Sequence, residues 1–150
     1  MASMGEVGTF HHQQPNPYLM ASSTVFIIPL YYANRIGNRP VQFICGSLTA
    51  VSLLYHATKH PFVFWLDQTA VWTFIVRSVI EGLRGGPKSL LFVAAANLTS
   101  AYLYVYGRYS KSLIWSDRYG EATATHAAMH LIAAAGYVGC MKWAEKPLLK

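Results

Sequence analysis

The sequence predicts an all-α integral membrane protein, a bundle of about five transmembrane helices. Apolar residues make up 53% of the 150-residue chain and charged residues only 12%, whereas soluble domains carry about 25% charged residues. A chain of this length forms one domain, and a domain this small has too little interior to bury so much apolar surface. We therefore expect the surplus apolar surface to face lipid or a large partner.

Five stretches approach the roughly 20 apolar residues that cross a bilayer. The links between them are short and rich in Gly, Pro and Asn, which predicts antiparallel neighbours in a compact bundle. The net charge is +6, but the basic residues stand singly between apolar runs, and no basic stripe interleaved with aromatic residues predicts nucleic-acid binding. The expected spans are residues 18–34, 40–58, 61–83, 89–107 and 122–141.

Each span has its own features. The first contains the apolar run 25–32, and the second has no charged residue. The third carries Asp67 and Arg77, and Arg77 precedes Glu81 by four residues, so we expect an ion pair along one helix face. The fourth follows a Gly-Gly-Pro turn, and the fifth follows a polar loop. Cys45 forms no CxxC pair with the other cysteine, which favours small apolar side chains over a disulfide or a metal knuckle.

The segments outside the spans are polar. Residues 1–17 form a polar N-terminal tail without the basic region of a signal peptide, 18–142 the transmembrane helical bundle, and 143–150 a basic C-terminal tail. Seven basic residues lie on the side opposite the N-terminus, which places the C-terminus in the cytosol or its equivalent. The N-terminal side carries four basic residues, namely Lys59, Arg108, Lys111 and Arg118.

Five polar side chains inside the spans are candidates for a site. Ser52 and His56 lie one turn apart near the end of the second span, Asp67 lies near the start of the third, and His126 and His130 lie one turn apart near the start of the fifth. Each pair alone is explained by packing, but alternating spans place all five near the same outer membrane face. Three neutral imidazoles with one open position are typical of catalytic zinc, and a carboxylate and a hydroxyl complete a hydrolytic site.

These residues resemble the alkaline ceramidases and the wider CREST superfamily of membrane hydrolases. The family pattern is a serine-xxx-histidine closing one helix, an aspartate opening the next and an HxxxH in the last helix. Ser52, His56, Asp67, His126 and His130 fill all five positions. The family bundle has seven helices where we count five, so the resemblance implies a truncated seven-helix ceramidase fold. The acidic, calcium-binding N-terminal segment of the ceramidases has no counterpart in this sequence.

The resemblance implies a zinc-dependent membrane hydrolase that acts on a lipid amide. In that case His56, His126 and His130 hold Zn²⁺, Asp67 accepts and returns a proton, and Ser52 binds the oxyanion or orients the water. The expected partners are membrane lipids and a lipid amide substrate. The expected location is the membrane of the endoplasmic reticulum or Golgi.

Other interpretations stay open. The chain could be a non-catalytic accessory subunit of a larger membrane complex, for example a mitochondrial inner-membrane assembly, with the small-residue runs 94–96 and 133–136 at subunit contacts. Packing within the bundle is the favoured explanation of these runs. Adiponectin-type receptors share the zinc pattern, so a receptor is a third interpretation. Bis-histidine haem binding is weaker, because His126 and His130 share one helix face.

Overall fold

The structure is a computed structural model that describes residues 14–144. Every regular element in that part of the chain is a helix, and the five predicted helical stretches are confirmed. The first stretch is an arm of three short pieces, and η4 leads into the last helix. The elements are α1 (Pro17–Ser23), η3 (Thr24–Phe26), α2 (Ile27–Arg35), α3 (Arg39–Thr58), α4 (Pro61–Arg84), α5 (Gly86–Ser110), η4 (Leu113–Trp115) and α6 (Tyr119–Ala144).

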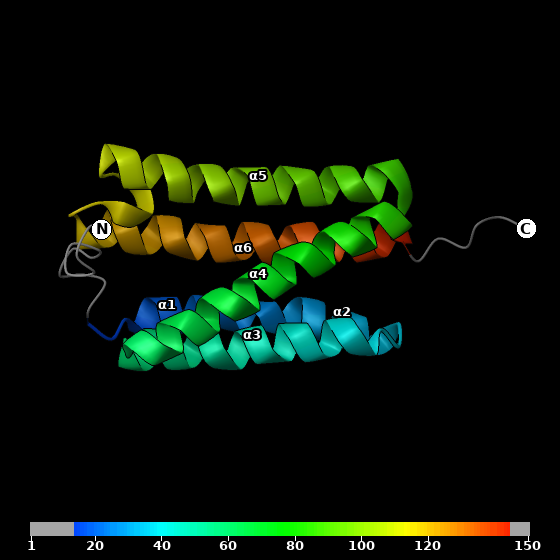
Figure 1. The fold of residues 1–150 in the computed structure, drawn as a ribbon, viewed down its shortest axis with the longest axis horizontal. Coiled ribbons are helices and arrows are strands. Elements are labelled where there is room, and N and C mark those ends of the chain that lie inside the picture. Colours follow the sequence, from blue (N-terminus) through cyan, green and yellow to red (C-terminus); the bar gives the residue numbers. More distant parts are fainter. Residues whose placement is uncertain (1–13, 145–150) are drawn as a thin grey trace, which may run out of the picture.

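The helices form a bundle in which α4 runs at an angle to the rest. Figure 1 shows α5, α6, α3 and the α1–α2 arm lying lengthwise, with α4 crossing them diagonally from the end of α3 to the start of α5. The extensive contact of α5 with α6 and the contacts of α1 with both α3 and α6 hold the layers together. As a result, the end of α3, the start of α4 and the start of α6 meet at one end of the bundle.

Local sequence explains where the helices begin and end. Asn16, Asn38 and His60 cap α1, α3 and α4 with side chains that accept backbone N–H groups, and a proline follows each cap within two residues. Lys59 and Lys111 end α3 and α5 in the left-handed conformation, each with φ 53°. A left-handed residue stops a helix because it turns the chain away from the helix axis.

The first predicted span is not one continuous α-helix. The hydroxyl groups of Ser22, Ser23 and Thr24 bond to carbonyls of the preceding turn, at 2.7–3.0 Å. Pro29 follows, and it has no N–H to offer the carbonyl of Val25. Both features disturb the α-helical ladder locally, which accounts for the 3₁₀ turn at Thr24–Phe26.

Small residues let α5 and α6 approach closely. A Cβ atom added to Gly136 would lie 2.2 Å from the Ala96 Cβ, and one added to Gly139 would lie 2.8 Å from the Phe92 ring. The small-residue runs therefore pack against each other inside the bundle, as the sequence favoured. The predicted ion pair between Arg77 and Glu81 is also present.

The outside of the bundle is strongly apolar. Among the described residues, α3 and α5 are long and apolar enough to cross a bilayer, judged by length and composition alone. The predicted spans at 18–34, 61–83 and 122–141 do not meet that test. The first of them is divided by η3, which leaves no helix of spanning length there. The most exposed large apolar residues include Tyr18, Phe43, Phe62, Trp72, Leu83, Leu91, Leu98 and Tyr109.

Substitution of Gly136 tests the close approach of α5 and α6. Gly136→Ala should lower the stability of the bundle by about 1–3 kcal/mol, because the new methyl group overlaps Ala96. Gly46→Ala in α3 is the matched control, since a Cβ there meets nothing within 4 Å and alanine favours a helix over glycine. Thermal unfolding of the purified variants measures both, and a Gly136→Ala protein as stable as Gly46→Ala would contradict this packing.

Candidate metal centre

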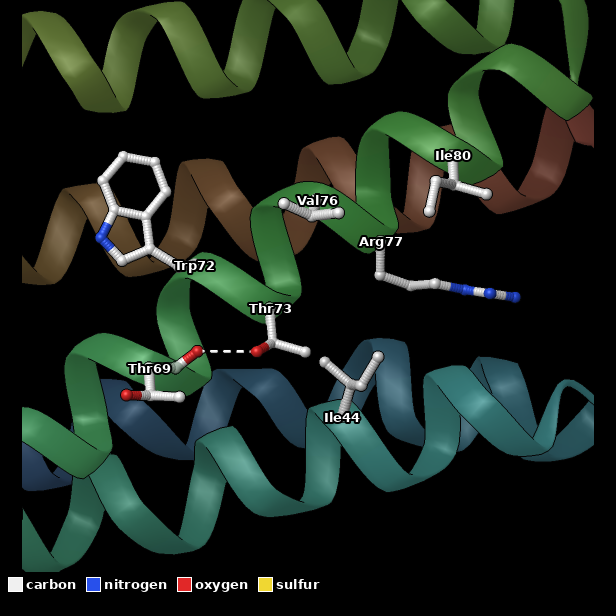
Figure 2. A pocket seen from close by; sticks show the side chains of 7 residues that line it. All are labelled: Ile44, Thr69, Trp72, Thr73, Val76, Arg77 and Ile80. Atoms are coloured by element: carbon white, nitrogen blue, oxygen red, sulfur yellow. Dashed lines mark hydrogen bonds between the residues drawn. The ribbon is translucent and has the colours of Figure 1, made fainter.

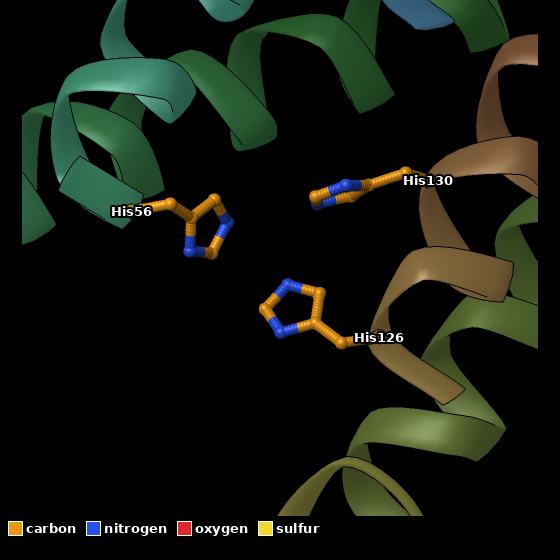
Figure 3. Close-up of side chains that lie close together, drawn as sticks. All are labelled: His56, His126 and His130. Atoms are coloured by element: carbon orange, nitrogen blue, oxygen red, sulfur yellow. The ribbon is translucent and has the colours of Figure 1, made fainter. Parts of the chain in front are cut away.

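Three histidine side chains meet where α3 ends and α6 begins. His56 comes from the last turn of α3, and His126 and His130 come from successive turns of α6. Figure 3 shows the three rings facing one shared space. One ligand nitrogen from each ring lies within 4.8 Å of the others, and the ring centroids are 4.8–5.7 Å apart. His56 and His130 are buried and His126 is half-buried, so this group could bind a metal ion.

The donor set fits a divalent transition metal. In a tetrahedral site with Zn–N bonds of about 2.0–2.1 Å, two ligand nitrogens lie about 3.4 Å apart. The ligand nitrogens of the three rings lie within 4.8 Å of one another, so they must draw closer by up to about 1.4 Å, which requires rotation of the side chains. Imidazole suits zinc, copper, iron and nickel alike, so the three ligands indicate a class of metal rather than one element.

Ser22 of α1 fixes the orientation of His130. Its hydroxyl lies 2.9 Å from His130 Nδ1 and also donates to the Leu19 carbonyl at 3.0 Å. A hydroxyl has one proton to give. Because the Ser22 hydroxyl donates its proton to the Leu19 carbonyl, its oxygen accepts a hydrogen bond from Nδ1–H of His130. The Nε2 lone pair of the neutral His130 ring is then available to a metal. Hydrogen bonds of this kind orient most metal-binding histidines.

The two predicted catalytic residues are both buried close to this group. Ser52, one turn before His56, is 2% exposed and its hydroxyl lies 3.1 Å from that of Ser23. The Ser52 hydroxyl also lies near the Asp67 carboxyl group. Asp67 is 6% exposed, and its Oδ1 atom has no hydrogen-bond partner among the described residues. An unsatisfied buried carboxyl oxygen is costly, which singles Asp67 out as a group with capacity for a ligand or a proton.

Lys59 is a neighbour of the site that the sequence did not indicate. Its Nζ atom lies 3.1 Å from His56 Nδ1 and 4.6 Å from the centre of the Tyr55 ring. Burial lowers the pKa of Lys59 to about 8, and the nearby Asp67 opposes that shift. Below this pKa the ammonium group donates to His56 Nδ1, so it competes with any ion that would bind this nitrogen. His60, in the link between α3 and α4, is exposed and caps α4.

Asn16 ties the arm to both histidine-bearing helices. Its backbone N–H donates to the His56 carbonyl at 3.0 Å, and its side-chain amide donates to the Thr123 hydroxyl at 2.9 Å. Its Oδ1 atom caps α1 at the same time. Asn16 belongs to the predicted polar tail, yet the residue is only 2% exposed. The Asn-Pro pair predicts that a helix starts here. The contacts of Asn16 with His56 and Thr123 are long-range, so no local sequence signal predicts them.

A comparison with known proteins finds no relative of this chain. No family model, no curated protein and no solved structure matches this chain. The resemblance to the ceramidases therefore depends on five side chains and their spacing, of which the three histidines now share one site.

Removal of the Ser22 hydroxyl tests its role beside His130. Ser22→Ala should weaken zinc binding by about 10- to 100-fold, the usual effect of losing a hydrogen bond to a metal-binding histidine. Ser22→Thr, which keeps the hydroxyl, should restore most of the affinity. Ser110→Ala, at an exposed hydroxyl on α5, is the control. Competition against a chromophoric chelator gives the affinities, and equal values for Ser22→Ala and wild type would refute this assignment.

Proposed function

We propose that the protein is a zinc-dependent hydrolase that cleaves an amide bond in a membrane lipid. The observation that carries this proposal is the meeting of three imidazoles beside a buried serine and a buried carboxyl group. The resemblance to the ceramidases supports the same chemistry, and it is the reason for naming zinc and a lipid amide.

The exterior of the bundle supports placement in a membrane. Phe43, Trp72, Leu91 and Leu98 are 65–77% exposed, and exposed apolar side chains of this kind suit a surface that faces lipid. Most basic side chains lie at the two ends of the helices, where headgroups and water would meet them. The proposed bundle has its histidine site toward the outer face, in a membrane of the endoplasmic reticulum or Golgi.

Each residue of the site has a separate role in the proposed amide hydrolysis. His56, His126 and His130 would hold the ion, which when bound lowers the pKa of its water to about 7 and polarises the substrate carbonyl. The water oxygen forms the new bond to the carbonyl carbon, and the C–N bond breaks to give a carboxylic acid and an amine. Asp67 accepts the proton of the water and returns it to the departing nitrogen. Ser52 donates its hydroxyl proton to the developing oxyanion.

An apolar groove beside the site suits a lipid substrate. It has a volume of about 420 Å³ and lies between the start of α1 and the start of α6. Ala127, which follows His126 in the chain, lies in its wall. An acyl chain in this groove would bring its amide toward the histidines from within the bilayer. The residues that line it are Tyr18, Tyr119, Gly120, Thr123, Ala124 and Ala127.

One contact favours the second candidate function, a non-catalytic accessory subunit of a larger membrane complex. The Lys59 ammonium group lies against His56 Nδ1, an arrangement that holds the His56 ring in place without an ion. A bundle of this kind would hold its histidines as packing and would act through other subunits. Zinc content and lipid hydrolysis separate the two functions.

Two conservative variants test the proposed hydrolase. In protein reconstituted with a panel of ceramides and related lipid amides, Ser52→Ala should lower the rate by about 10²–10³-fold and Asp67→Asn by about 10²–10⁴-fold. Both should keep their metal, because neither residue is a ligand. Thr49→Val, one turn earlier on α3, removes a buried hydroxyl that bonds only to the backbone carbonyl of Cys45 and should keep its rate. Amide hydrolysis that survives both substitutions would contradict the proposed roles.

A further inference from the structure

A partly buried cluster of charged residues lies near the other end of α4. Arg77 and Arg84 both donate to one oxygen of Glu81, its Oε1 atom, with Arg84 at 3.3 Å. The Glu81 side chain is 7% exposed and that of Arg77 18%. Two guanidinium groups offer ten N–H donors, and the buried Nε of Arg77 has no hydrogen-bond partner among the described residues. The cluster thus keeps a surplus positive charge and unused donors.

Among residues 14–144, the surroundings do not neutralise that surplus. At the end of the bundle where α2, α4 and α6 finish and α3 and α5 begin, Glu81 is the one acidic residue in the described part of the chain. The opposite end has Asp67, Asp117 and Glu121 among its basic residues. The basic residues at the Glu81 end are Arg35, Arg39, Arg77, Arg84, Lys88 and Lys142.

A groove on the outer face of α4 reaches this cluster. It lies between α4 and α3 and has a volume of about 520 Å³. Figure 2 shows Arg77 extending along the groove toward the end of α4, with Ile44 of α3 facing it from below. Trp72, Val76 and Ile80 form an apolar wall along α4.

The groove is apolar up to the arginine. The hydroxyl groups of Thr69 and Thr73 are bonded to backbone carbonyls within α4, at 2.8 and 2.7 Å, so they offer no free proton to a ligand. Thr69 to Ile80 spans about 16 Å of helix, close to half of a hydrocarbon core about 30 Å thick. The apolar groove residues of α4 are exposed whereas Asp67 is buried, so the groove and the proposed catalytic carboxyl group lie on different faces of α4.

We infer that this groove binds an anionic membrane phospholipid. One acyl chain lies along Trp72, Val76 and Ile80, and the phosphate accepts hydrogen bonds from the guanidinium groups of Arg77 and Arg84. Charge complementarity favours this ligand. The arginine cluster has positive charge and hydrogen-bond donors in excess, which suit a phosphate, and the groove beside it is apolar, which suits an acyl chain. The inference rests on the proposed membrane placement but not on the metal or on hydrolysis.

The test is lipid retention from nanodiscs that contain phosphatidylcholine and phosphatidylglycerol. Wild-type protein extracted in mild detergent should retain phosphatidylglycerol in preference to phosphatidylcholine, as measured by native mass spectrometry. Arg84→Gln should lower that retention about fivefold, the effect of one basic residue at a membrane surface. Arg84 is suited to this test because its side chain is 62% exposed. Val76→Trp, which fills the groove, should lower retention of both lipids at this site.

Matched variants at other places keep the test specific. Lys111→Gln at the opposite end and Val105→Trp on the exposed face of α5 should retain phosphatidylglycerol as wild type does. The inference would be overturned if Arg84→Gln retained as much phosphatidylglycerol as Lys111→Gln, or if Val76→Trp retained as much as Val105→Trp. Displacement of the lipid by soluble glycerol phosphate alone would also overturn it. Zinc content measured on the same samples separates the two proposals. Lipid retention in protein that holds no zinc would contradict the proposed hydrolase and leave the lipid site supported.

Discussion

The bridge that Asn16 and α1 make between the end of α3 and the start of α6 is the constraint on which the rest of the site depends. Those two helices are far apart in sequence, and Asn16 joins them by donating to the His56 carbonyl and to the Thr123 hydroxyl. Because Thr123 is one turn before His126, the same residue sets the spacing of imidazoles from both helices. The arm that Asn16 begins then supplies Ser22 to His130 and Ser23 to Ser52, so one short segment supports both halves of the site.

Helix α4 separates two kinds of polar chemistry. Its first turns carry Asp67, buried toward the bundle interior, and its last turns carry the Arg77–Glu81–Arg84 cluster. The stretch between them faces outward with apolar side chains such as Trp72 and Val76. Ionisable groups inside a membrane are expensive and are kept where they are paired or used. On our account the carboxyl group serves hydrolysis at one end and the arginines hold a lipid at the other.

Sequence alone predicted the helices well because apolar runs and Pro, Gly and Asn links are local signals. It also predicted that the three histidines would share a layer, because alternating spans fix which ends meet. It did not predict Ser22 or Lys59, whose contacts depend on how α1 lies against α6 and on a left-handed turn after α3. The break at Thr24–Phe26 escaped prediction for a related reason: hydroxyl-to-backbone bonds and one proline acted together on a run that is otherwise apolar.

The central claim is that His56, His126 and His130 bind zinc. Elemental mass spectrometry on protein purified in detergent without a chelator tests it most directly. We expect about one zinc per chain. The zinc should be lost in His56→Ala and in His130→Ala, and it should be kept in His60→Ala, where the imidazole caps α4 outside the site. Freshly purified protein without zinc, or with zinc that survives His56→Ala and His130→Ala, would contradict the proposed zinc site.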